Sequence, residues 1–154
     1  MKVFIKTFGC RVNQVESQAV FERFQADGHI ITNDFNTADL CLLNTCCVTH
    51  KADRDVLREI RKIIKANPSA RLIITGCAAA AQKEKITAQF PTVEIIYKTD
   101  LGKKLFGAEI YWTIREHNNH SRAFVKIQDG CDYFCSYCIV PYARPQKSSK
   151  PKQI

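Results

Sequence analysis

Eight cysteines are the residues of this 154-residue chain that could do the most chemistry. Thiolates bind metal ions and iron–sulfur clusters, and thiols form disulfides in oxidising compartments. The N-terminus has one basic residue followed by alternation, without the apolar segment and small-residue cleavage site of a secretory signal. We therefore expect the chain to stay in the reducing cytoplasm, with cysteines that are reactive or metal-bound rather than disulfide-bonded.

Three cysteines, which we call the strand-end cysteines, each follow a predicted strand. They end the segments Phe8-Gly9-Cys10, Asn44-Thr45-Cys46 and Thr75-Gly76-Cys77. In an open parallel sheet, the loops that leave the carboxyl ends of the strands share one edge, where ligands bind. Gly9 and Gly76 let the chain turn sharply and approach a bulky ligand, and a following helix N-terminus favours the thiolate.

Three converging thiolates suit an iron–sulfur cluster or a zinc ion. The alternative is that each strand-end cysteine is a separately buried small side chain, because free cysteine is commonly buried. That alternative fits Cys41, which lies inside the apolar run 40–43. Cys47 is ambiguous because it adjoins Cys46, and adjacent residues rarely bind the same centre from one side.

A second group, the loop cysteines, consists of Cys131, Cys135 and Cys138 in a CxxxCxxC run directly after a predicted strand. A loop this tight can wrap three corners of a 4Fe-4S cluster and leave one iron for another ligand. The alternatives are a zinc site completed by a histidine or a redox pair of the last two thiols. The histidines available for zinc are His29, His50, His117 and His120. Nearby aromatic residues would either fill a core or shield a cluster and offer a face to a base or cofactor: Tyr133, Phe134 and Tyr137.

Apolar strands alternate with amphipathic helices over the first two thirds of the chain. The predicted strands are 3–8, 40–43, 72–75 and 93–97, and the predicted helices are 13–26, 51–65, an Ala-rich helix ending near Gln89 and a weak helix over 101–106. This alternation predicts an α/β fold, a doubly wound parallel sheet over residues 1–107. Residues 108–122 are predicted to be a linker, and a strand at 123–127 then leads into the cysteine-rich loop of segment 123–154.

Charge indicates the kind of partner. Lys and Arg number 23 against 15 Asp and Glu, a net charge of +8, which favours a polyanionic partner or an anionic substrate. The tail 141–154 contains bases but no acid, and we expect it to be flexible. Helix 51–65 also has a basic surplus, which is either a solvated face or a contact for RNA. No apolar run approaches the ~20 residues of a membrane helix, so we expect no membrane partner.

These motifs together resemble one known family. Residues 128–144, QDGCDYFCSYCIVPYAR, resemble the radical S-adenosylmethionine loop of the methylthiotransferases. The strand-end segments at 9–13, 44–46 and 75–77 resemble the three signatures of that family's N-terminal domain, so six cysteines stand in the family's order. Within the family, stretches 9–17 and 48–54 look most like the tRNA threonylcarbamoyladenosine branch.

The resemblance implies two 4Fe-4S clusters and S-adenosyl-L-methionine. The loop cysteines would bind the cluster whose open iron chelates S-adenosyl-L-methionine, with Tyr137 beside this cofactor. One electron would cleave it to a radical that abstracts hydrogen from the adenine ring of threonylcarbamoyladenosine, next to the tRNA anticodon. The strand-end cysteines would bind an auxiliary cluster that carries or delivers sulfur, and a second S-adenosyl-L-methionine would supply the methyl group of the 2-methylthio product. Asn13 and Asn44 would have only a supporting role.

The implied partners are tRNA, an electron donor and a sulfur donor. Family members are much longer, with a partial β/α barrel and an RNA-binding TRAM domain, and Pro145 here replaces a family glycine. We therefore expect residues 123–154 to be the truncated start of a radical SAM domain, and this chain alone to be a catalytically incomplete fragment. The alternatives are a ribosomal-protein aspartate or isopentenyladenosine tRNA as the substrate, or a non-catalytic module that binds zinc or nucleic acid.

Overall fold

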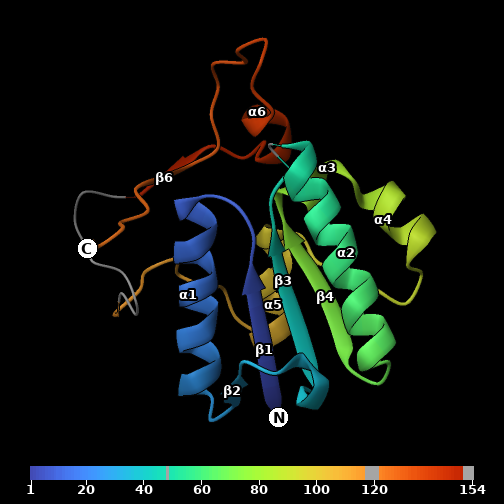
Figure 1. The fold of residues 1–154 in the computed structure, drawn as a ribbon. Coiled ribbons are helices and arrows are strands. Elements are labelled where there is room, and N and C mark those ends of the chain that lie inside the picture. Colours follow the sequence, from blue (N-terminus) through green and yellow to red (C-terminus); the bar gives the residue numbers. More distant parts are fainter. Residues whose placement is uncertain (48, 117–121, 151–154) are drawn as a thin grey trace.

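Five parallel strands form the centre of the computed structural model, which describes residues 1–47, 49–116 and 122–150. Their order across the sheet is β2-β1-β3-β4-β5 (Figure 1). The strands are β1 (Lys2–Thr7), β2 (Ile30–Thr32), β3 (Leu40–Thr45), β4 (Arg71–Gly76) and β5 (Glu94–Ile95). In this order the direction of winding reverses between β1 and β3, so the predicted doubly wound α/β fold is confirmed.

Helices cover both faces of this sheet (Figure 1). On one face lie α1 (Arg11–Ala26) and α5 (Lys98–Phe106), and on the other lie α2 (His50–Ala66), α3 (Cys77–Ala81) and α4 (Lys83–Gln89). Phe24 and Leu101 pack with Leu42 on the first face, whereas Ile60 and Ile86 belong to the core of the second. All six residues of β3 are buried, as expected for a central parallel strand with both faces covered.

Local sequence signals set the helix ends. The helix α1 ends just before Gly28, whose φ of 78° is a conformation that glycine adopts without strain. The helix α2 begins after Thr49, whose hydroxyl oxygen accepts a hydrogen bond from the Ala52 amide at 3.1 Å. The same helix ends at Ala66, next to the predicted Asn67-Pro68 stop.

Several short elements differ from the sequence predictions. The edge strand β2 and the 3₁₀ helix Phe35–Thr37 are too short to give a periodic signal. The Ala-rich helix is broken at Gln82 into α3 and α4, and β5 has only two residues of the predicted 93–97 strand. The predicted strand 123–127 does not form, because no other described strand lies beside it, and Val125 and Ile127 are exposed.

The C-terminal segment runs across the carboxyl edge of the sheet (Figure 1). Its strands β6 (Gln128–Asp129) and β7 (Ser148–Ser149) pair antiparallel, and α6 (Val140–Ala143) lies between them in sequence and packs against α3. Residues 141–150 are therefore folded onto the domain, contrary to the expectation of a flexible tail; residues 151–154 lie outside the described part. The predicted division at 107 and 122 stays a prediction. Among the described helices, none has the length and apolar character needed to cross a bilayer.

Candidate metal and cofactor site

Topology brings the strand-end cysteines to one edge of the sheet. Cys10 follows β1 and immediately precedes α1, Cys46 follows β3, and Cys77 is the first residue of α3. The three strands are neighbours, with Thr7 paired to Asn44 and Thr45 paired to Gly76. Cys10 and Cys46 therefore flank the point where the winding reverses, which is where doubly wound sheets bind their ligands.

Two glycines allow these strand ends to lie close together. Gly9 has a φ of 102°, and a Cβ placed on it would lie 2.4 Å from Cys46 Cβ and 2.7 Å from Cys46 Sγ. A Cβ on Gly76 would lie 2.4 Å from the Thr45 carbonyl oxygen. Both close approaches are made to the neighbouring strand end, and the predicted approach to a bulky ligand stays a prediction.

Two buried asparagine side chains join the strand ends to α1. Asn13 Nδ2 donates hydrogen bonds to the carbonyl oxygens of Phe8 and Thr45, both at 2.9 Å. Asn44 Nδ2 donates to the Asn13 carbonyl oxygen at 2.9 Å and to Ser17 Oγ at 3.0 Å. Asn44 Oδ1 is buried and has no hydrogen-bond partner among the described residues. These amides therefore fix the backbone around the cysteines; a supporting role beside a bound cluster stays a prediction.

Cys77 has the most perturbed environment of the strand-end cysteines. A hydrogen bond from the Cys47 thiol is the main cause that lowers the pKa of Cys77 to about 6; burial opposes it, and the nearby Arg144 cation lowers the pKa further. Arg144 Nε donates to Cys77 Sγ at 3.3 Å. The same contact with Cys77, together with burial, raises the pKa of Cys47. The neighbours that lower the pKa of Cys77 are thus the Cys47 thiol and the Arg144 guanidinium, and the contribution expected from the helix N-terminus stays a prediction.

The remaining strand cysteine behaves as a core residue. Cys41 is fully buried within β3, and burial raises the pKa of its thiol to about 11. All eight cysteines of the chain are free thiols.

The strand-end cysteines fit a thiolate-bound cluster by donor type and placement. Three thiols share one edge, and the neighbours of Cys77 lower the pKa of its thiol to about 6, which favours the thiolate form that binds metals. Cys10 is exposed, so a bound group at this edge would be reachable from solvent. Within residues 1–47, 49–116 and 122–150, however, no three side chains of His, Cys, Asp or Glu already stand close enough to hold a metal ion.

The loop cysteines lie between β6 and α6, in the loop that rises above the sheet edge (Figure 1). Cys135 is exposed, whereas Cys131 and Cys138 are half-buried, and the Cys138 amide donates to the Cys135 carbonyl oxygen at 2.9 Å. Tyr137 is 90% exposed and Tyr133 is 85% exposed, so these aromatic residues do not fill a core in this structure.

Two of the histidines considered for the zinc alternative can be placed along the chain. His50 is the first residue of α2, which follows β3 at the carboxyl edge of the sheet. His29 directly precedes β2 and so lies at the amino end of the sheet, where its ring packs 5.6 Å from that of Phe24. His117 and His120 lie outside the described residues.

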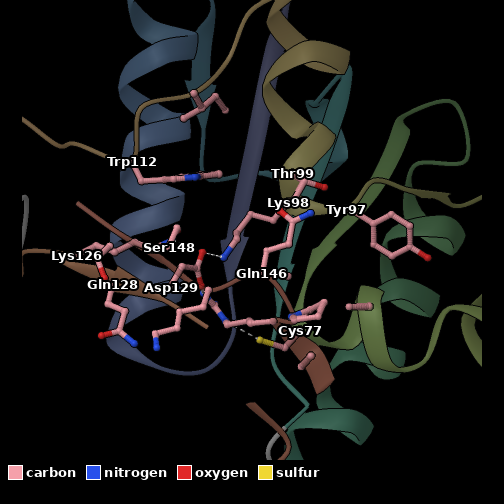
Figure 2. A pocket seen from close by; sticks show the side chains of 18 of the residues that line it. Cys77, Tyr97, Lys98, Thr99, Trp112, Lys126, Gln128, Asp129, Gln146 and Ser148 are labelled. Atoms are coloured by element: carbon pink, nitrogen blue, oxygen red, sulfur yellow. Dashed lines mark hydrogen bonds and ion pairs between the residues drawn. The ribbon is translucent and has the colours of Figure 1, made fainter. Parts of the chain in front are cut away.

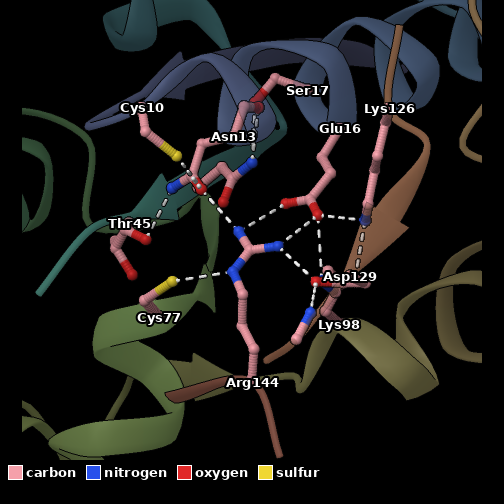
Figure 3. Close-up of polar contacts among 12 residues, drawn as sticks. Cys10, Asn13, Glu16, Ser17, Thr45, Cys77, Lys98, Lys126, Asp129 and Arg144 are labelled. Atoms are coloured by element: carbon pink, nitrogen blue, oxygen red, sulfur yellow. Dashed lines mark hydrogen bonds and ion pairs between the residues drawn. The ribbon is translucent and has the colours of Figure 1, made fainter. Parts of the chain in front are cut away.

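A buried network of five charged side chains lies beside Cys77 and was not predicted from the sequence (Figure 3). Its members are Glu16 on α1, Lys98 on α5, Lys126, Asp129 on β6, and Arg144. Lys126 Nζ lies 2.6 Å from Glu16 and 2.7 Å from Asp129, and Arg144 Nη1 lies 2.9 Å from Glu16 and 2.7 Å from Asp129. Lys98 also contacts both carboxylates.

The network keeps its carboxylates ionised despite burial. Burial alone would raise the pKa of Glu16, but the Lys98 and Arg144 cations outweigh it and hold this pKa below its ordinary value. Asp129 is shifted in the same direction: burial is again outweighed, here by hydrogen bonds from Lys126 and Lys98, so its pKa is lowered. Sequence reasoning missed the network because its partners are far apart in the chain; the only signal was Arg144, within the resemblance at 128–144.

A cavity of about 1040 Å³ opens next to the network and Cys77 (Figure 2). Its walls combine aromatic side chains such as Tyr97 and Trp112 with Lys98, Lys126 and Arg144. This size and mixture suit an organic cofactor or a nucleoside that carries polar groups.

Comparisons with known proteins agree with this architecture. Residues 2–98 match the family described as "Uncharacterized protein family UPF0004". Over 152 residues the chain is 38% identical to a threonylcarbamoyladenosine tRNA methylthiotransferase, MtaB, of Chlamydia pneumoniae, which covers 94% of this chain and 36% of that protein.

Two further relatives are named for another substrate. The chain is 31% identical to a tRNA-2-methylthio-N(6)-dimethylallyladenosine synthase of Cereibacter sphaeroides, over 97% of this chain and 40% of that protein. It is 32% identical to the synthase of the same name from Desulfotalea psychrophila, over 96% of this chain and 39% of that protein. The chain thus spans about two fifths of the length of the curated relatives it matches.

Proposed function

The chain belongs to the UPF0004 family, the N-terminal domain of the methylthiotransferases, and we propose that it works in a tRNA methylthiotransferase. The proposed reaction converts threonylcarbamoyladenosine near the anticodon to its 2-methylthio derivative. The proposed cofactors are S-adenosyl-L-methionine and two 4Fe-4S clusters, which when bound would supply radical chemistry and sulfur. The proposal includes an electron donor, a sulfur donor and a cytoplasmic location; the isolated chain is expected to be catalytically incomplete.

Each group of cysteines has its own role in this proposal. Cys10, Cys46 and Cys77 would hold the auxiliary cluster at the sheet edge, where Asn13 and Asn44 fix the backbone. Cys131, Cys135 and Cys138 would hold the second cluster in the loop above that edge, with Tyr137 beside S-adenosyl-L-methionine. The exposure of Tyr137 leaves its ring free to stack on a cofactor or base.

One observation carries the proposal: three cysteines far apart in the sequence end three neighbouring parallel strands at one edge. Separately buried thiols would not need this shared position. They would also not need a glycine beside Cys46 and another at the end of β4, whose neighbours leave no room for a Cβ.

Iron and sulfide analysis after anaerobic reconstitution tests the ligand assignment. We expect about eight iron and eight sulfide per chain, and a loss of about half of each when Cys10, Cys46 and Cys77 are replaced by Ser. The triple Ser variant of Cys131, Cys135 and Cys138 should lose the other half. Cys41→Ala is the matched control because Cys41 is buried in the core, and it should keep all the iron.

Two results would contradict this assignment. Stoichiometric zinc without acid-labile sulfide would favour the non-catalytic zinc-binding module instead. Equal iron in the parent chain and in the strand-end triple variant would mean that these cysteines hold no cluster.

A second substrate is favoured by the relatives from Cereibacter sphaeroides and Desulfotalea psychrophila, whose name specifies dimethylallyladenosine in tRNA. Nucleoside profiling of tRNA from a strain that lacks this gene separates the two substrates. Loss of the 2-methylthio derivative of threonylcarbamoyladenosine supports the first, and loss of the 2-methylthio derivative of isopentenyladenosine supports the second.

A further inference from the structure

The loop that carries Cys131, Cys135 and Cys138 is closed at its base by a buried ion pair. Asp129 precedes the loop, Arg144 follows α6, and Arg144 Nη1 donates to Asp129 Oδ1 at 2.7 Å. The backbone of Asp129, in β6, is also paired with that of Ser148 in β7. The two ends of the loop are therefore held together by both charge and backbone pairing.

The same guanidinium also reaches the edge of the parallel sheet (Figure 3). Its Nη2 donates to Asn13 Oδ1 at 2.7 Å and to Glu16 Oε2 at 3.2 Å, both on α1. Its Nε donates to Cys77 Sγ at 3.3 Å, and Cys10 Sγ donates to the same Asn13 Oδ1 at 3.6 Å. One side chain thus touches the loop base, α1 and one strand-end cysteine, and it shares an acceptor with a second.

The charged network around Arg144 carries a surplus of positive charge next to Cys77. The buried network contains three cations and two carboxylates, so one positive charge is not balanced within it. The Arg144 side chain is only 9% exposed, and its Nε donates to the Cys77 sulfur at 3.3 Å, so this positive charge lies directly beside a strand-end cysteine. A lysine could supply the charge, but its donors sit on one nitrogen and lack the planar fork over three nitrogens with which arginine reaches the loop base, α1 and Cys77 together.

We propose that Arg144 is a positioning residue that couples the two cysteine groups. It holds the base of the loop against α1. It also donates a hydrogen bond to the sulfur of Cys77 and places a positive charge beside it. The coupling rests on the proposed function in one respect, namely that Cys77 holds the auxiliary cluster. Hydrogen bonds to cluster sulfurs and nearby positive charge raise a cluster's reduction potential, so this contact would also tune the auxiliary cluster.

Hydrogen exchange of the metal-free chain tests the fastening. In Arg144→Gln, Glu16 and Asp129 are still balanced by Lys98 and Lys126, so we expect the variant to fold. Amides of the loop and α6 should exchange at least about tenfold faster than in the parent chain, while amides of β3 and β4 stay unchanged. Arg144→Lys should restore part of the protection.

The matched control is Arg58→Gln, which removes an arginine from an exposed ion pair on α2 and should leave the loop unchanged. Equal exchange of the loop amides in Arg144→Gln and the parent chain would overturn the proposal.

The reduction potential separates coupling from a purely structural role. It is measured on reconstituted protein in which the loop cysteines are Ser, so that only the auxiliary cluster is present. Arg144→Gln should shift the midpoint potential to a more negative value, and Arg58→Gln should not. A potential that does not move, even with faster loop exchange, would reduce Arg144 to a structural residue and overturn the coupling.

The two proposals can fail separately. If the chain binds no iron, the proposed function is wrong, while exchange of the metal-free chain still decides whether Arg144 fastens the loop. If both clusters form and neither exchange nor potential responds to Arg144→Gln, the proposed function stands and the coupling is wrong.

Discussion

Glycine at positions 9 and 76 allows the cysteine-bearing strand ends to lie close together, and Gly76 is the more constrained of the two. At Gly76, φ is 90° and ψ is −160°, a region of backbone conformation that is essentially restricted to glycine. The space around it is also closed, because a Cβ would overlap the Thr45 carbonyl oxygen and Asn44 Oδ1. Conformation and crowding therefore act together on the residue directly before Cys77.

We expect Gly76→Ala to lower the free energy of unfolding by about 3–5 kcal/mol, from backbone strain plus the overlap with β3. Gly28→Ala is the matched control: its φ of 78° is also positive, but nothing lies within 4 Å of the added Cβ. Its cost should be about 1 kcal/mol, from conformation alone. Denaturant unfolding of both variants makes the comparison, and equal costs would show that the edge is not closely packed at Gly76.

At the scale of elements, the charged network joins the C-terminal segment to the helices α1 and α5. Glu16 on α1 accepts hydrogen bonds from Lys98 at the start of α5, from Lys126 before β6, and from Arg144 after α6. The Glu16 side chain is only 2% exposed, so water cannot replace its charge if it is removed. The three cations would then share Asp129 as the one carboxylate left in the network.

Glu16→Gln should therefore cost about 3 kcal/mol of unfolding free energy at neutral pH. The folded-state pKa of Glu16 lies below its ordinary value of 4.5, so its ionised form stabilises the fold fully above that value. This contribution is lost as the pH falls through the folded-state pKa. Denaturant titrations should give a constant difference between parent and variant above about pH 5 and a shrinking difference below it.

Glu84→Gln, an exposed change on α4, serves as the control and should be nearly neutral throughout. A parent–variant difference for Glu16 that stays the same at pH 3 would contradict the ionised network.

The sequence was sufficient to predict the strands and helices whose apolar residues recur with a strong period. The central strands, α1 and α2 follow from apolar patterns and stop signals such as Gly28, and the shared edge of the strand-end cysteines follows from parallel topology. The break at Gln82 and the two- and three-residue strands β5 and β2 lack such a period.

The rest of the candidate site depends on tertiary contacts that no local pattern encodes. Arg144 belongs by composition to a solvated basic tail, yet its side chain is only 9% exposed because it pairs with Glu16 and Asp129 from elsewhere in the chain. The contact between Cys47 and Cys77 likewise depends on how β3 and β4 end side by side.

At the scale of the whole molecule, the net charge of +8 suits a polyanionic partner. The helix α2 contributes to this surplus with Arg54, which is exposed, and Arg58, whose side chain is 77% exposed. Arg61 is partly engaged, because it donates to Gln89 Oε1 at 3.2 Å and lies over the ring of Phe90.

We expect replacement of Arg54, Arg58 and Arg61 by Ala to weaken binding of unmodified tRNA and to flatten its salt dependence. Each lost phosphate contact should reduce the slope of log affinity against log salt by about 0.9. Fluorescence anisotropy over a salt series measures both. The double variant Lys103→Ala and Lys104→Ala, on the opposite face of the sheet, is the control. Unchanged affinity in the triple variant would leave α2 as a solvated basic face.

The central claim is that Cys10, Cys46 and Cys77 act as one ligand set, and anomalous scattering at the iron edge tests it most directly. Crystals of anaerobically reconstituted protein should show an iron peak at the carboxyl edge of the sheet, bonded to the sulfurs of these three residues. Iron confined to the loop cysteines, with the three strand-end sulfurs bonded to no metal, would contradict the claim.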